Sequence, residues 1–174
     1  MAITLFPNGR ILHNGVEVAS DKMADQWRVN ANFTSANTTP HISSNWERND
    51  TSFSVLGAGM SESSGIFTFP ETGIYQVDFS AMGSASGTQV RYVVAEILYT
   101  TNNFTSSSNI AFGNGSISND ATANAQSSAS TIFDVTNTAT HKVKFTVTAE
   151  SALTWECNST ANSTYATFIR LGGT

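Results

Sequence analysis

Hydrophobic and polar residues alternate with a period of two along most of the chain. The clearest examples are "QWRVNANF" at residues 26–33 and "HKVKFTVTAES" at residues 141–151, in which aromatic or aliphatic side chains are separated by polar ones. This alternation is typical of β-strands with one buried face. Helical periodicity is nearly absent. Its best candidate is "SDKMADQW", where the pattern predicts a short helical turn that starts after Ser20 and ends near Trp27.

Three Asn-Gly pairs occur in the chain: Asn8-Gly9 follows Pro7 as a turn signal, and the other two interrupt alternating segments. Asn14-Gly15 separates "RILH" from "VEVA", and Asn114-Gly115 lies in "GNGSISND". Asn-Gly is favoured in two-residue hairpin turns because both central residues of a type I′ turn need a positive φ. We therefore expect a β-hairpin around Asn14 and Gly15, and a second hairpin at Asn114-Gly115. Residues 1–25 form a small separate β element in this interpretation, and residues 26–174 form the main domain.

The stretch "GIFTFPETGIYQVDFSA", Gly65 to Ala81, predicts two strands joined by a tight turn. Pro70 ends the first strand because it has no backbone N–H to donate to a ladder. Gly73 follows the turn and is expected to adopt a backbone conformation that other residues resist. From Tyr75 onward, apolar residues alternate with Gln, Asp and Ser.

About ten short strands with frequent turn signals predict an all-β, antiparallel sandwich of the jelly-roll type. The alternative, an immunoglobulin-type sandwich, would show fewer strands. The last apolar residues, including Phe168, place a strand at the C-terminal end of the chain. The fold class predicted is therefore an antiparallel β-sandwich jelly roll with a short N-terminal hairpin extension.

The composition narrows the possible functions. Only 12% of the 174 residues are charged. Eight lysines and arginines stand against 13 aspartates and glutamates, which gives a net charge of −5. A nucleic-acid-binding protein needs clustered basic residues to displace counterions from phosphates. No apolar run approaches the length of a membrane span, and no basic patch suits a membrane surface. We expect neither nucleic-acid binding nor membrane insertion.

Few residues suggest catalysis or metal binding. Cys157 lies in "TWECNST" without a nearby base, and His13, His41 and His141 have no second ligand at metal spacing. Glu156 follows Trp155, a pair that would suit a sugar-binding site, and "GNGSISND" at 113–120 has some features of a calcium loop. Each of these is more simply explained as a core, turn or surface residue. We expect no catalytic residue, no cofactor and no metal.

One motif resembles a known family. Gly65, Phe67, Pro70, Gly73 and Tyr75 match, position by position, the signature of the globular head of complement C1q and its tumour-necrosis-factor relatives. "YATFIRLGG" resembles the closing strand of that family, with Phe168 in the aromatic position, and "WRVNANF" occupies the place of its opening strand. The resemblance covers about residues 26–173. The chain lacks the collagen-like stalk and the paired cysteines of the animal proteins.

The resemblance implies a jelly roll that assembles as a tight homotrimer, with apolar residues on the flat sides of the sandwich meeting at the three-fold axis. The strand predicted at Val90–Tyr99 is apolar on both faces, as expected of a central strand or of one that faces a partner subunit.

Layout and composition together favour a bacteriophage virion protein, made in the host cytoplasm and displayed on the particle surface. In this hypothesis residues 1–25 dock a C1q-like head onto other virion proteins of a capsid or tail, and the head contacts a host surface glycan or protein. The alternatives are a soluble lectin-like or cytokine-like recognition module outside a virus, and a surface-polysaccharide hydrolase that uses two carboxylates.

Overall fold

The fold was examined in a computed structural model. It describes residues 22–35, 39–51, 53–85, 87, 89–118 and 122–174, together with the backbone of three short strands that precede them. No helix occurs in these parts of the chain, and hence none that could cross a membrane.

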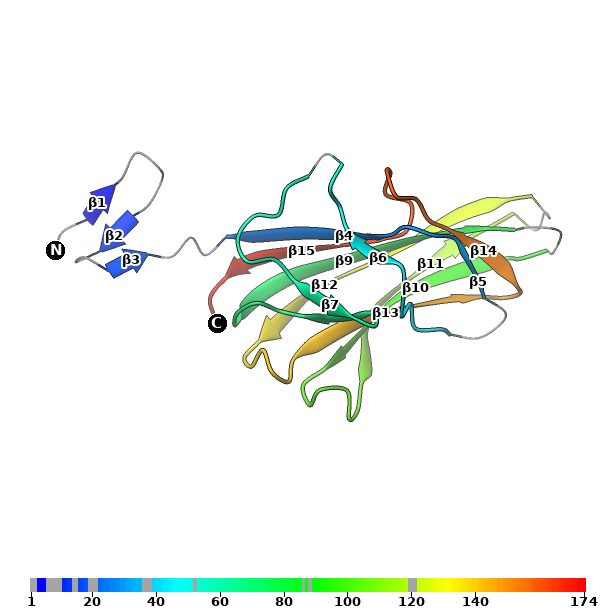
Figure 1. Ribbon diagram of the computed structural model, residues 1–174. Coiled ribbons are helices and arrows are strands. Elements are labelled where there is room, and N and C mark those ends of the chain that lie inside the picture. Colours follow the sequence, from blue (N-terminus) through cyan, green and yellow to red (C-terminus); the bar gives the residue numbers. More distant parts are fainter. Residues whose placement is uncertain are drawn as a thin grey trace.

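Within the described residues, fifteen strands form three antiparallel sheets (Figure 1). The small sheet contains β1 (Ile3–Leu5), β2 (Ile11–His13) and β3 (Val16–Val18). A seven-stranded sheet contains β4 (Met23–Val29), β5 (Phe33–Ser35), β6 (Trp46–Arg48), β9 (Gly73–Ser84), β12 (Asn124–Val135), β14 (Leu153–Glu156) and β15 (Tyr165–Gly172). A five-stranded sheet contains β7 (Ser61–Ser63), β8 (Ile66–Thr68), β10 (Tyr92–Thr100), β11 (Ser108–Ser116) and β13 (Lys142–Ala149).

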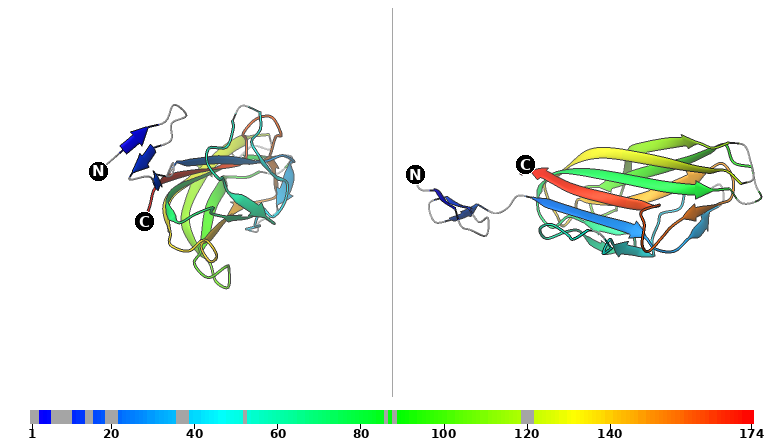
Figure 2. Two further views of the ribbon diagram at one scale, coloured as in Figure 1. Left: turned by 60° about the vertical axis from the view of Figure 1, so that its left-hand side comes forward. Right: turned by 90° about the horizontal axis from the view of Figure 1, so that it is seen from above.

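The two larger sheets stack as a sandwich, which confirms the predicted all-β jelly-roll class (Figure 2). β9 is the central strand of the seven-stranded sheet: β12 pairs along its whole length on one side, and β15 and β14 share its other side. The C-terminal strand β15 lies between β4 and β9. The first and last strands of the head are therefore neighbours, and both chain ends leave the sandwich at the same end (Figures 1 and 2).

Aromatic side chains from both sheets fill the core. Phe67, Phe79, Phe145 and Phe168 are all buried, and the rings of Phe79 and Phe145 stack across the sandwich at 4.6 Å between centroids. The predicted alternation is seen directly in β13, where Val143, Phe145 and Val147 are buried. Large buried rings of this kind dominate the hydrophobic stabilisation of a domain.

The predicted helical turn between Ser20 and Trp27 is wrong for the described residues, because Met23 to Val29 form strand β4. Met23, Asp25 and Val29 are buried towards the core, and the strand is paired on both sides, with β15 and β6. Tertiary pairing outweighs a weak local capping signal. β4 begins three residues before residue 26, so the segment 1–25 expected to dock the head overlaps the first strand of the head.

The second hairpin prediction is also wrong. Asn114 and Gly115 lie within β11 and pair with Val94 and Val93 of β10. A Cβ atom on Gly115 would lie 2.4 Å from the carbonyl oxygen of Gln126 in β12, and the neighbouring Gly113 has an even closer backbone contact. Glycine is needed here because β11 and β12 approach each other closely where the two sheets meet, rather than for a turn.

The predicted N-terminal hairpin is partly described. β2 and β3 pair antiparallel, with His13 opposite Val16. Asn14 and Gly15, the expected turn residues, lie outside the described residues. β1 adds to β2 to complete a small sheet, which is drawn apart from the sandwich in Figure 1 and in the right-hand view of Figure 2.

Candidate functional site

The two motif glycines each occupy a position where no other residue fits easily. Gly65 has a φ of 75°, and a Cβ atom there would lie 2.0 Å from the carbonyl oxygen of Ile42. Gly73 has a φ of 151°, and its Cβ would lie 2.5 Å from the carbonyl oxygen of Gly172 and 2.6 Å from Nε of Arg170. Gly65 therefore allows the segment at Ile42 to reach the β7–β8 turn, and Gly73 allows β15 to reach the β8–β9 turn; both roles are structural.

The other motif residues organise the core around that turn. Phe67 and Phe168 pack at 5.2 Å between ring centroids, and Phe69 packs on Tyr75 at 4.7 Å. The Tyr75 hydroxyl donates a hydrogen bond to the carbonyl oxygen of Glu71 (2.9 Å), closing the turn that contains Pro70. The motif thus supports the architecture, and it places no reactive group at the surface.

The residues weighed as catalysts lie in unsuitable surroundings. Trp155 is fully buried and donates its indole N–H to Ser35 Oγ (2.7 Å), so its ring is unavailable to stack on a sugar. Glu156 accepts a hydrogen bond from Asn32 Nδ2 (2.9 Å). Burial raises the pKa of the Cys157 thiol to about 11, which keeps it protonated at neutral pH. Within the described ranges no three His, Cys, Asp or Glu side chains gather as metal ligands.

His41 lies against the five-stranded sheet, where it forms a bridge with Thr146. Burial of the ring is the main cause that lowers its pKa below the usual 6.5; the charge of Lys144 also lowers it, while the Gly65 backbone and Glu62 act in the opposite direction. The folded protein therefore binds this proton less readily than the unfolded chain does. Above about pH 6.5 the ring is neutral in both states and the fold has its full stability; as the pH falls below 6.5, proton uptake by the unfolded chain lowers the free energy of unfolding.

We therefore expect the free energy of unfolding to decrease as the pH falls from 7.5, through 6.5, towards the lowered pKa of folded His41. Urea unfolding at several pH values measures this, and His41→Gln, which cannot take up the proton, should show a flatter profile over the same range. An identical profile for the two proteins would contradict the assignment.

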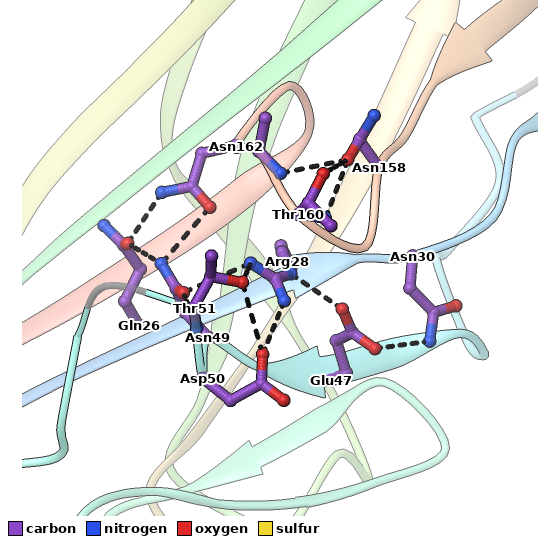
Figure 3. A network of polar contacts seen from close by, with 11 residues as sticks. Gln26, Arg28, Asn30, Glu47, Asn49, Asp50, Thr51, Asn158, Thr160 and Asn162 are labelled. Atoms are coloured by element: carbon purple, nitrogen blue, oxygen red, sulfur yellow. Dashed lines mark hydrogen bonds and ion pairs between the residues drawn. The ribbon is translucent and has the colours of Figure 1, made fainter.

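A network of polar side chains covers the outer side of β4 (Figure 3). Arg28 is only 1% exposed, and its guanidinium donates to Glu47 Oε1 (2.7 Å), Asp50 Oδ1 (2.8 Å), Asn49 Oδ1 (3.2 Å) and Thr51 Oγ1 (3.2 Å). All three guanidinium nitrogens of Arg28 donate hydrogen bonds within the network. The network therefore fixes residues 46–51 against β4, and the Arg28 guanidinium is not free to bind a ligand.

Gln26 links this network to the open face of the sheet. Its Oε1 accepts hydrogen bonds from Asn49 Nδ2 (2.7 Å) and Asn162 Nδ2 (2.6 Å), and its Nε2 donates to Thr167 Oγ1 of β15 (2.9 Å). The polar side chains of the segments around residues 49 and 162 thus lie along β4, and we call them the polar rim (Figure 3). The sequence pattern placed Gln26 and Arg28 on the polar side of a strand, but it gave no signal of their partners.

Beside this rim, the outer face of the seven-stranded sheet contains a trough of about 390 Å³. Its lining comes from β4, β9, β12 and β15, and includes Gln26, Asp78, Ser128, Ser130, Tyr165 and Thr167. Nearer the chain ends, the same face carries three exposed aliphatic side chains: Ile132 (63% exposed), Ile169 (37%) and Leu171 (53%). The face therefore has an apolar part and a polar, hollowed part.

β10, the strand expected to be apolar on both faces, is a central strand. It lies between β11 and β13, and Val93, Ala95 and Ile97 are buried on its inner side.

No family model and no curated protein matches the chain. Among solved structures, the chain is similar to murine APRIL, with 10% identity and a TM-score of 0.58 over 86% of this chain and 99% of that one. It is also similar to Eiger TNF from S. frugiperda, with 9% identity and a TM-score of 0.65 over 88% of this chain and 94% of that one. At such low identity these likenesses show the fold alone: the head is a jelly roll of the tumour-necrosis-factor type.

Proposed function

We propose that the chain is a non-enzymatic bacteriophage virion protein whose C1q-like head is a surface-exposed homotrimer that decorates the capsid or tail. The observation that carries the trimer is the cluster of exposed aliphatic side chains Ile132, Ile169 and Leu171 on one face of a tumour-necrosis-factor-type sandwich. An isolated head would leave this apolar patch in water, where it favours association.

A second apolar surface suits a ring of copies. Phe112 is 69% exposed on β11, at the edge of the other sheet. Two unlike patches on one subunit favour a heterologous contact, in which the aliphatic patch of one copy meets the Phe112 surface of the next copy. Repeating this contact generates a closed ring when the rotation between copies divides a full turn.

Charge and layout support the virion part of the proposal. The patch and β11 carry no charged side chain, and the whole chain is poor in charge, which suits a subunit built into a large assembly. The small N-terminal sheet stands apart from the head (Figure 1), where the part of residues 1–25 that precedes β4 can dock other virion proteins while the far end of the head reaches a host glycan or protein.

Ile132→Asp tests the trimer. A charge in the apolar patch should shift the light-scattering mass from three subunits to one, because a buried unpaired carboxylate costs several kcal/mol in each contact. Ser63→Asp, an exposed change on β7 at the opposite edge of the other sheet from β11, is the matched control and should remain a trimer. A single-subunit mass for the unaltered protein would contradict the proposal.

Deletion of residues 1–21 tests docking. Since β4 begins at Met23, this deletion keeps the head sheets complete. The shortened protein should remain a soluble trimer that no longer joins virus particles, as seen by sedimentation with particles and by negative-stain imaging. Loss of the trimer itself would contradict this division of labour between the segment and the head.

A second candidate is a soluble cytokine-like recognition module outside a virus. The likeness of the head to APRIL and Eiger TNF favours it. A full-length trimer that never associates with particles would favour this candidate.

A further inference from the structure

The register of the small N-terminal sheet divides its residues between two faces. Successive residues of a strand belong to opposite faces, and residues paired across neighbouring strands belong to the same face. β2 is the central strand, between β1 and β3. One face of the sheet carries five aliphatic residues and one histidine: Ile3, Leu5, Ile11, His13, Val16 and Val18. The opposite face carries Thr4, Leu12 and Glu17.

The apolar face of this small sheet needs a second layer. An amphipathic sheet has to bury its apolar face against another element, and a few short strands are marginally stable without such packing. Each of the three strands has only three residues. Among the described strands, none of the sandwich pairs with this sheet. The second layer therefore has to come from another element or another molecule.

The chain brings the small sheet next to the subunit contact of the proposed trimer. Ala24, near the start of β4, is paired with Ile169, and the same row continues through Gln76 to Ile132. Only residues 19–22 separate β3 from β4. Extended chain between Val18 and Met23 spans at most about 18 Å. A trimer joined through the aliphatic patch therefore tethers three small sheets close together, at a high effective concentration.

Three identical apolar faces can meet without bringing like charges together. Among the residues of the three strands, Glu17 is the only acidic one, and there is no lysine or arginine. The register places Glu17 on the opposite face. Like charges in a shared contact would cost several kcal/mol, and this arrangement avoids that cost. Another copy of the same face is thus suitable in chemistry, and the trimer supplies it.

We propose that the three N-terminal sheets of a trimer pack their apolar faces against one another and form a single three-fold base where the chains enter the heads. The inference rests on the proposed function, because it describes the docking segment of that trimer as one base instead of three separate arms. Sheets of this size do not join the copies by themselves: the heads hold the copies together, and the base forms as a consequence.

Adjacent residues of β2 supply the test and its matched control. Ile11 lies in the middle strand on the apolar face, and Leu12 lies in the same strand on the opposite face. In the full-length protein, Ile11→Cys treated with a short bis-maleimide should join two chains in most trimers, seen as a two-subunit band on a denaturing gel. Leu12→Cys should remain almost entirely as single chains.

The native cysteine adds little to this readout. Burial raises the pKa of the Cys157 thiol to about 11, so it is protonated and weakly reactive at neutral pH. The unaltered protein, treated in the same way, measures the remaining background.

A second pair of variants measures how much the base stabilises the trimer. Ile11→Asp places a carboxylate in the shared apolar base, and it should raise the concentration at which the trimer dissociates by about tenfold or more. Leu12→Asp should change that concentration by less than about twofold, because the residue lies on the outer face. Both variants should remain trimers at high concentration, since the patch on the heads is unchanged.

The outcomes separate this inference from the trimer itself. A trimeric unaltered protein whose Ile11→Cys variant gives no cross-link would overturn the inference and leave the trimer standing; the apolar face would then pack on its own head or on another virion protein. Equal cross-linking of Ile11→Cys and Leu12→Cys, or equal effects of the two aspartate variants, would also overturn it, because the two faces would then be equivalent. A single-subunit mass for the unaltered protein would overturn the proposed trimer and this inference together.

Discussion

Replacing Gly65 by alanine should lower the free energy of unfolding by about 3 kcal/mol or more, enough to unfold a marginally stable domain. Two costs combine. The φ of 75° is unfavourable for any residue with a Cβ atom. The new methyl would also lie 2.0 Å from the Ile42 carbonyl oxygen and 2.6 Å from His41 Nε2. Ile42 cannot move away easily, because its N–H is bonded to the Phe145 carbonyl oxygen of β13 (3.0 Å).

Gly87→Ala separates these two costs. Gly87 has nearly the same φ, 77°, but a Cβ atom there would meet no atom of the described residues within 4 Å. We expect Gly87→Ala to cost only about 1 kcal/mol, the conformational term alone. Urea unfolding of both variants at one fixed protein concentration measures the difference, since association of subunits affects apparent stability. Equal losses would show that the contact with Ile42 has no energetic weight.

Gly65 also illustrates what the sequence could predict. The alternating strands and turn signals predicted the jelly roll because they are local properties, and the motif of Gly65, Phe67, Pro70, Gly73 and Tyr75 added a resemblance to one family of that fold. The reason for the glycine was not readable, since the obstructing atoms belong to Ile42 and His41 in a separate segment of the chain. Glycine at 115 was misinterpreted for the same reason: a close approach between sheets and a hairpin turn favour the same residue.

The trough lay beyond sequence reasoning in a different way. Asp78, Ser130, Thr167 and Gln26 come from four strands that are far apart in the chain, and only the register of the sheet brings them into one row. Each residue alone is an ordinary polar position on the solvent side of a strand. By contrast, the pair Trp155 and Glu156 is adjacent in sequence and drew attention, yet one member is buried in the core.

Asp25→Ala should be the most destabilising change of a charged residue that we can identify, at about 3–5 kcal/mol. Asp25 is fully buried, and its carboxylate accepts hydrogen bonds from Arg48 Nε (3.0 Å), the Trp27 indole N–H (2.9 Å) and the Met60 backbone N–H (2.7 Å). Removing it leaves these donors unsatisfied, and the buried Met60 N–H has the least access to water. The segment between β6 and β7 would lose one of its attachments to β4 and would keep the backbone bridge between Leu56 and Ala24.

The control for Asp25 is another aspartate paired with an arginine. Asp50 is bonded to Arg28 at 2.8 Å, but its side chain is 83% exposed, and Arg28 keeps Glu47 as a partner when Asp50 is removed. Asp50→Ala should therefore cost less than about 1 kcal/mol, as is usual for exposed ion pairs. Urea unfolding of the two variants under matched conditions compares one buried and one exposed carboxylate. Similar losses would mean that burial of Asp25 does not determine its contribution, and that the segment at residues 49–60 is held mainly by other contacts.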